Sequence, residues 1–142
     1  ERAKADGATV LTGGGPNTEL GGLFYEPTIL ADCPEGSEIL TEEVFGPVLT
    51  IETFSGDDEG VAKANDTRFG LAATLVTSDP ERAEKVSAQL RAGTVWVNFF
   101  FVRDLGAPFG GSGQSGIGRE GGIWSFDFYC DVKNSVFAPA SN

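Results

Sequence analysis

The sequence contains no histidine and no methionine among its 142 residues, and only two of them are cysteines. The absence of histidine excludes, for this chain alone, a catalytic base or a metal site that depends on imidazole. Cysteines and carboxylates do not cluster with metal-ligand spacing either, so we expect no metal site. Two cysteines make no disulfide framework, which favours a reducing, cytoplasmic setting.

Basic residues are also scarce: 10 lysines and arginines stand against 21 acidic residues, a net charge of −11. This charge argues against nucleic acids and anionic membranes as partners, because both bind basic surfaces. No apolar run approaches the ~20 residues of a membrane-spanning helix, and no signal-peptide pattern opens the chain. A hydrophobic content of 40% is that of an ordinary globular domain.

The first residues, ERAKADGATVLTGG, have the pattern of a helix end. Arg2 and Lys4 suit a last helical turn, and Gly7 stands where a left-handed glycine often follows one. We therefore expect the chain to be the C-terminal piece of a longer protein. A short protein with a processed N-terminus is the alternative.

The middle of the chain alternates strand and helix patterns. Buried strands are predicted at 47–54, 70–78 and 93–98, which are short apolar runs between turn residues. Helices are predicted at 57–67 and 78–93. This alternation is typical of βαβ units, so we predict an α/β fold with a parallel sheet flanked by helices.

Each predicted helix has a capping signal and an apolar face. Asp57 or Asp58 can cap the first helix, and Ser78 or Asp79 can cap the second, where Pro80 fits the first turn. The residues expected to be buried are Val61, Ala62 and Ala64 in the first helix and Ala83, Val86 and Leu90 in the second.

Aromatic or aliphatic and polar residues alternate in the tail, SFDFYCDVKNSVFA, which predicts an edge strand over 125–138. A lone strand has no obvious partner in this chain, and pairing with another subunit would satisfy it. We therefore expect residues 125–142 to form an oligomerisation strand and tail, and residues 1–124 to belong to the preceding domain.

The segment PFGGSGQSGIGREGG (108–122) contains G-x-G-x-x-G at Gly111, Gly113 and Gly116. A dinucleotide-binding fingerprint needs a strand before the first glycine and a helix after the last. Neither is evident here, because further glycines follow and disfavour a helix. A structural loop is the favoured interpretation, although the pattern alone leaves nucleotide binding open.

Few residues suggest chemistry by themselves. Cys33 lies in a turn and Cys130 in the tail, and neither has a cationic activator close in sequence, so both are interpreted as structural thiols. In TEEVFGPVLTI (41–51) two carboxylates precede an aromatic residue. That segment is either a solvated acidic turn or a place where a glutamate binds sugar hydroxyls and the phenylalanine packs against a ring.

Four motifs in order, EEVFGPV (42–48), ANDTRFGLAA (64–73), GTVWVN (93–98) and PFGGSGQSGIGREGG (108–122), resemble the C-terminal third of the aldehyde dehydrogenase superfamily. Within it, VRDLGAPFGG and REGGIWSFDFY are most similar to dehydrogenases of hydroxymuconic semialdehydes, including the 5-carboxymethyl-2-hydroxymuconate type. The resemblance covers essentially the whole chain. It implies a glycine-rich loop beside the substrate entrance, and Gly113 departs from the lysine that many relatives carry.

The resemblance also implies roles for individual residues. Glu43 would accept hydrogen bonds from the nicotinamide-side ribose of NAD or NADP, and Phe45 would pack near the nicotinamide. Phe109 would line the aldehyde tunnel. Arg103 lies in the same stretch and could bind a substrate carboxylate, or it could be a solvated neighbour of Asp104.

The family's catalytic cysteine, which forms a thioester with the aldehyde, and its catalytic glutamate lie upstream of the matched region. We therefore expect no catalytic residue in this chain, and the chain alone to be inactive as a fragment of an NAD(P)-dependent enzyme. A non-catalytic self-association module is the alternative function.

Overall fold

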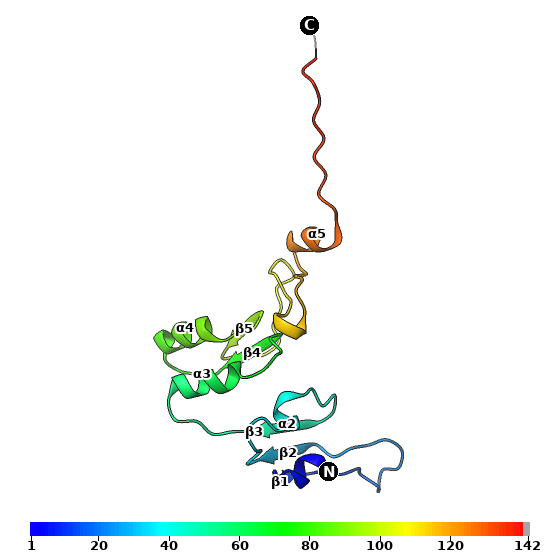
Figure 1. Cartoon of the computed structure of the whole chain (residues 1–142), viewed down its shortest axis with the longest axis vertical. Coiled ribbons are helices and arrows are strands. Elements are labelled where there is room, and N and C mark those ends of the chain that lie inside the picture. The colour runs from blue at the N-terminus through cyan, green and yellow to red at the C-terminus, as the bar shows by residue number, and fades with distance from the viewer. Residues whose placement is uncertain (141–142) are drawn as a thin grey trace. The chain divides into compact units, whose positions relative to one another are not determined.

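The computed structural model describes residues 1–140 and divides into two compact units, Glu1–Gly60 and Val61–Asn142. Short helices and strands alternate along both units (Figure 1). Both contain a pair of parallel strands. The predicted α/β class is confirmed. The boundary that we expect between residues 124 and 125 stays a prediction.

The first unit is built on a three-stranded sheet in the order β1-β2-β3. β1 (Thr9–Thr12) runs antiparallel to β2 (Thr28–Ala31), and β3 (Val48–Ile51) runs parallel to β2. The central position of β2 buries alternate side chains, Thr28 and Leu30. β3 confirms the strand predicted at 47–54, but its predicted burial is wrong, because Leu49 and Ile51 are 58% and 44% exposed. β1 and β2 were not predicted.

Two short helices complete this unit. α1 (Arg2–Ala5) confirms the predicted helix end, because Asp6 caps it and Gly7 follows with φ +109°. α2 (Glu38–Thr41) was not predicted, and it precedes the turn into β3. Four residues form little more than one helical turn, which is too short for an apolar period to be visible in the sequence.

The second unit contains a βαβ arrangement. β4 (Ala72–Leu75) and β5 (Thr94–Val97) are parallel, and α4 (Pro80–Gln89) connects them (Figure 1). The Asp79 carboxylate accepts hydrogen bonds from the N–H groups of Glu81 and Arg82 at 3.0 and 3.1 Å. Asp79 is therefore the cap of α4. The predicted apolar face is confirmed, because Val86 is buried and Ala83 and Leu90 are half-buried.

α3 (Asp57–Asn65) differs from expectation in detail. It begins at Asp57, so both candidate aspartates lie in its first turn. Val61 is half-buried, but Ala62 and Ala64 are exposed, so their predicted burial is wrong. Within the described residues, nothing covers that side of the helix enough to bury the two small side chains.

The predicted tail strand is wrong over its first part. Residues Trp124–Tyr129 form a helix, α5, which is followed by residues 130–140 without helix or strand (Figure 1). The backbone closes locally, since the N–H of Cys130 donates to Phe126 O at 2.9 Å and Gly121 N–H donates to Ser125 Oγ. Pairing of the remaining tail with a second copy stays a prediction.

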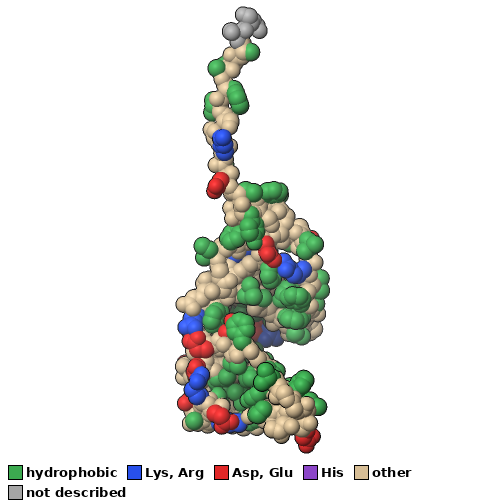
Figure 2. All heavy atoms as spheres, turned by 90° about the vertical axis from the view of Figure 1, so that its right-hand side faces the viewer, with side chains coloured by type: hydrophobic (Ala, Val, Ile, Leu, Met, Phe, Trp, Pro, Cys, Tyr) green, Lys and Arg blue, Asp and Glu red, His purple; other side chains and the backbone are tan. Residues whose placement is uncertain are grey.

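Apolar side chains are exposed over much of the chain, and Figure 2 shows them on the face turned to the viewer and along the tail. Leu23, Ile117 and Val132 are exposed almost completely. Within residues 1–140, the buried hydrophobic side chains are Ala8, Leu30, Val86 and Trp96. Apolar surface of this extent is normally covered by other protein. No helix in the described part of the chain has the length and hydrophobicity to span a bilayer.

Candidate functional site

The turn between α2 and β3 presents Glu43 and Phe45 at the surface of the first unit. α2 ends at Thr41, and the extended backbone of the next residue, Glu42 (φ −112°, ψ 149°), leads the chain out of the helix. Phe45 has φ +46°, in the left-handed region that bulky residues rarely adopt, and its side chain is 90% exposed. Glu43 is exposed as well. An unusual backbone conformation thus holds a carboxylate and an aromatic ring two residues apart in solvent.

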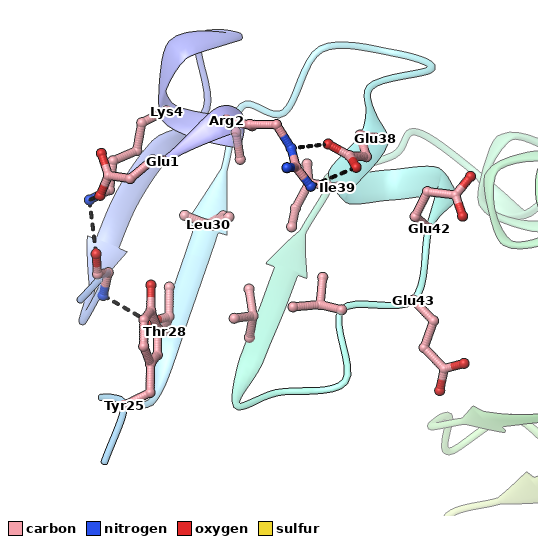
Figure 3. Close-up of a pocket in the computed structure, with 14 residues that line it drawn as sticks. Glu1, Arg2, Lys4, Tyr25, Thr28, Leu30, Glu38, Ile39, Glu42 and Glu43 are labelled. Atoms are coloured by element: carbon pink, nitrogen blue, oxygen red, sulfur yellow. Dashed lines mark hydrogen bonds and ion pairs between the residues drawn. The ribbon is translucent and has the colours of Figure 1, made fainter. Parts of the chain in front are cut away.

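Two hollows of the first unit meet at this turn. The larger, of about 460 Å³, is bounded by Thr28 of β2 and by Arg2, whose Nε and Nη2 donate to the Glu38 carboxylate at 2.6 and 2.8 Å (Figure 3). The smaller, of about 330 Å³, is lined by both Glu43 and Phe45. At this smaller hollow, a carboxylate can accept hydrogen bonds from hydroxyl groups and an aromatic face can pack against a planar ring.

The second unit brings Arg103 and Phe109 together with Glu120. Phe109 and Glu120 are paired in an isolated antiparallel bridge, whose two N–H···O bonds measure 2.7 and 2.8 Å. Arg103 Nη2 donates to Glu120 Oε1 at 2.9 Å, and Arg103 Cζ lies 4.0 Å from the centroid of the Phe109 ring. The cation is thus held by a carboxylate and an aromatic face.

In this geometry Arg103 pairs with Glu120 and not with Asp104, and whether Arg103 binds a substrate carboxylate stays a prediction. The Asp104 carboxylate accepts a hydrogen bond from the N–H of Gly106 at 2.8 Å, whereas the ion pair of Arg103 is with Glu120. Its side chain is 30% exposed, so the guanidinium is reachable from solvent. Glu120 was missed at the sequence level, because its contact depends on the bridge that closes the glycine-rich loop.

The glycine-rich loop is fixed against the residues that precede β4. Ser112 N–H donates to Gly70 O and Gln114 N–H donates to Arg68 O, both at 2.9 Å. Gly113–Ser115 form a short 3₁₀ turn, and the next helix, α5, begins only at Trp124. The loop therefore lacks the helix start that a dinucleotide fingerprint requires, and the structural interpretation is confirmed.

Gly113 suits this loop conformation. Its φ is +58°, and a Cβ there would lie 2.5 Å from the carbonyl oxygen of Arg68. Any other residue would be strained at this position unless the loop moved. At Gly113 the loop therefore approaches the backbone of the chain before β4 closely.

The two cysteines lie in different surroundings. Cys33 is half-buried beside β2, and burial, followed by the negative charges of Glu52 and Asp32, raises the pKa of its thiol. A raised pKa keeps the thiol protonated and therefore weakly nucleophilic at neutral pH. Cys130 is exposed at the end of α5. Within residues 1–140, no three or more histidine, cysteine or acidic side chains gather in a group that could hold a metal.

The sequence profile of the aldehyde dehydrogenase family matches residues 1–135. The chain belongs to the aldehyde dehydrogenase family. It is 49% identical over 138 residues to 2-hydroxymuconic semialdehyde dehydrogenase of Pseudomonas sp. (strain CF600), and the match covers 94% of this chain and 28% of that protein. It is 46% identical over 136 residues to betaine aldehyde dehydrogenase of Brucella anthropi, with the same coverage of 94% and 28%.

Solved structures of family members superpose well on this chain. Betaine aldehyde dehydrogenase from Staphylococcus aureus in complex with NAD+ matches with a TM-score of 0.84 and 44% identity, over 89% of this chain and 26% of that one. An indole-3-acetaldehyde dehydrogenase complexed with NAD+ matches with a TM-score of 0.86 and 42% identity, over 92% and 27%. The chain thus spans little more than a quarter of the length of these relatives. The family resemblance carried by the four sequence motifs is confirmed.

Of the two predicted pairs of site residues, the structure places Arg103 and Phe109 in contact with each other and adds a third residue, Glu120. Glu43 and Phe45 share a hollow in the other unit. Their roles toward cofactor and substrate stay predictions.

Proposed function

We propose that this chain is the C-terminal part of an NAD(P)-dependent aldehyde dehydrogenase that oxidises a carboxylated semialdehyde, such as 5-carboxymethyl-2-hydroxymuconate semialdehyde, to the acid. The reaction would proceed through a cysteine thioester in the cytoplasm, with the catalytic cysteine and glutamate outside this chain. Family membership and the semialdehyde dehydrogenases among the relatives support the reaction class.

The residues of the first unit fit a role in holding NAD(P)+. The exposed Glu43 carboxylate can accept hydrogen bonds from ribose hydroxyls, and the exposed Phe45 ring can pack beside the nicotinamide. When bound, the cofactor supplies the acceptor for hydride from the substrate. The contribution of these two residues is positional, because productive transfer requires a fixed ring orientation.

The observation that carries the substrate class is Arg103 stacked on Phe109. The relatives named above include enzymes for substrates of opposite charge, anionic hydroxymuconic semialdehyde and cationic betaine aldehyde. A quaternary ammonium group binds well on an open aromatic face, but the guanidinium already covers Phe109. The same guanidinium attracts a carboxylate and repels a cation, so we infer an anionic substrate.

A comparison of kcat/KM for an anionic and a cationic aldehyde tests this function. With NAD+, the whole enzyme that contains this chain should oxidise 2-hydroxymuconic semialdehyde with a kcat/KM at least about tenfold above that for betaine aldehyde, the effect of one charged hydrogen bond. NADH formation measures both. A preference for betaine aldehyde would contradict the anionic substrate, and failure with every aldehyde would contradict the activity.

The cofactor role of Glu43 gives a second test in the whole enzyme. Glu43→Gln should slow hydride transfer by roughly 1.5–3 kcal/mol, since a charge-assisted hydrogen bond is lost. The melting temperature should stay nearly unchanged because the side chain is exposed. Stopped-flow measurement of NADH in a single turnover reports the step. Glu35→Gln, at an exposed glutamate outside both hollows, is the matched control, and equal rates in wild type and Glu43→Gln would reject the assignment.

A self-association role is the second candidate, and it is compatible with the first. The apolar tail residues Val132, Val136 and Phe137 are at least 85% exposed, as expected for a segment that binds another surface. We propose a homo-oligomer in which this segment pairs with a second copy.

A further inference from the structure

Glu120 and Phe109 hold Arg103 jointly. They lie directly opposite each other in the backbone bridge, so their side chains leave the same face of the pair. The guanidinium lies over the Phe109 ring at 4.0 Å and meets Glu120 through Nη2 alone, with no further hydrogen bond of Arg103 in residues 1–140. The Nε and Nη1 groups are therefore available to a ligand carboxylate.

We propose that Glu120 sets the selectivity of the enzyme between carboxylated and uncharged aldehydes, by acting as the counter-ion of Arg103. The inference rests on the proposed function, in which Arg103 binds the substrate carboxylate. Glu120 acts through Arg103, and it is a specificity-determining residue that takes no part in the chemical step.

The physical basis is competition between two carboxylates for one cation. Glu120 offsets part of the positive charge that would attract a substrate, and a substrate carboxylate on the other edge of the guanidinium would lie near enough to be repelled. In exchange, the contact orients the guanidinium over Phe109 so that its free edge is fixed. Glu120 therefore weakens the attraction of Arg103 for the substrate carboxylate but fixes the orientation of the guanidinium.

The magnitude of this competition is limited by solvent. The side chains of Arg103 and Glu120 are 30% and 50% exposed, so water screens their interaction with a third charge. We expect removal of the Glu120 charge to change substrate selectivity by about threefold to tenfold.

The experiment uses the whole enzyme and a pair of six-carbon substrates, 6-oxohexanoate and hexanal. The measured quantity is the ratio of their kcat/KM values, in which any change of rate common to both substrates cancels. Glu120→Gln keeps an oxygen that accepts from Arg103 Nη2 but removes the charge. Its ratio should rise about threefold to tenfold in favour of 6-oxohexanoate, mainly through KM. An unchanged or lower ratio would overturn the proposal.

Four further variants make the result specific. Glu120→Asp keeps the charge and should leave the ratio within about twofold of wild type, whereas Glu120→Ser, a second neutral variant, should raise it. In an Arg103→Gln background, Glu120→Gln should have no effect on the ratio, because the partner is gone.

The Arg103→Gln variant also separates the two hypotheses. If Arg103→Gln leaves the wild-type ratio unchanged, the proposed substrate role of Arg103 is wrong. If it lowers the ratio while neither neutral variant at Glu120 raises it, only the selectivity role of Glu120 is wrong.

Discussion

The isolated 142-residue chain should form no NADH from any aldehyde, even when it is supplied with NAD+ at high concentration. The proposed reaction needs a thiolate that attacks the aldehyde carbon and a base that activates water for hydrolysis of the thioester. In the proposed reaction a cysteine and a glutamate outside this chain perform these two tasks, and within the chain Cys33 is a half-buried thiol whose pKa is raised. We therefore expect the isolated chain to lack all of the NADH-forming activity of the whole enzyme.

The properties of Cys33 make this expectation specific. Its pKa is raised by burial, by Glu52 and by Asp32, so the protonated thiol predominates at neutral pH and the thiolate fraction grows only as the pH rises. The half-buried thiol also donates a weak hydrogen bond to Ala31 O, with an Sγ···O distance of 3.9 Å. A desolvated thiol of this kind is a packing group.

The assay compares the isolated chain with the whole enzyme and follows NADH by absorbance. Circular dichroism of the chain shows whether its helices have formed, and light scattering reports the association that its exposed apolar side chains favour. NADH formation that disappears in Cys33→Ala or Cys130→Ala would contradict the assignment of the nucleophile to another part of the enzyme.

The helix α4 and the strands on either side of it could be predicted from sequence. The helix of α4 has a cap at Asp79, a proline at its first position and an apolar face centred on Val86, and all three signals agree with one another. The strands β4 and β5 lie in nearly continuous apolar segments, and their type follows from the helix between them. Agreement of local signals with the tertiary arrangement makes such a segment predictable.

The strands β1 and β2 could not be predicted, although β3, β4 and β5 are equally short, because their pairing depends on a segment distant in the sequence. β1 and β2 have four residues each, and their pairing joins segments separated by a long loop. The tail shows the opposite failure: its polar and apolar alternation fits a strand, yet local hydrogen bonds close a helical turn at Trp124–Tyr129. A six-residue segment carries too little periodicity to separate the two structures.

The candidate site divides in the same way. Glu43, Phe45, Arg103 and Phe109 were found from motifs that resemble a known family, because each motif is contiguous in sequence. Glu120 was not found, although it belongs to a quoted motif, since only the bridge to Phe109 places its carboxylate on Arg103. Contacts across a glycine-rich loop cannot be predicted from sequence, because glycine permits many loop conformations.

Arg103→Ala in the whole enzyme should lower kcat/KM for carboxylated semialdehydes by about tenfold to a hundredfold, which corresponds to roughly 1.5–3 kcal/mol for a charged hydrogen bond. The guanidinium can bind the far end of the substrate through its free edge and thereby orient the aldehyde carbon toward the catalytic cysteine. A cation is scarce on a chain of net charge −11, so few nearby groups could replace it.

Uncharged aldehydes of the same length should be nearly unaffected by Arg103→Ala. Truncation also frees the half-exposed Glu120 carboxylate, but water can solvate it, so the melting temperature should fall only slightly. Lys85→Ala, which removes a positive charge from the exposed side of α4, is the matched control for a general electrostatic effect. Steady-state kinetics with 6-oxohexanoate and hexanal measure the effect. Equal losses of kcat/KM with both substrates would make Arg103 a structural residue and would remove the main reason for an anionic substrate. A loss confined to 6-oxohexanoate follows only if the guanidinium binds its carboxylate.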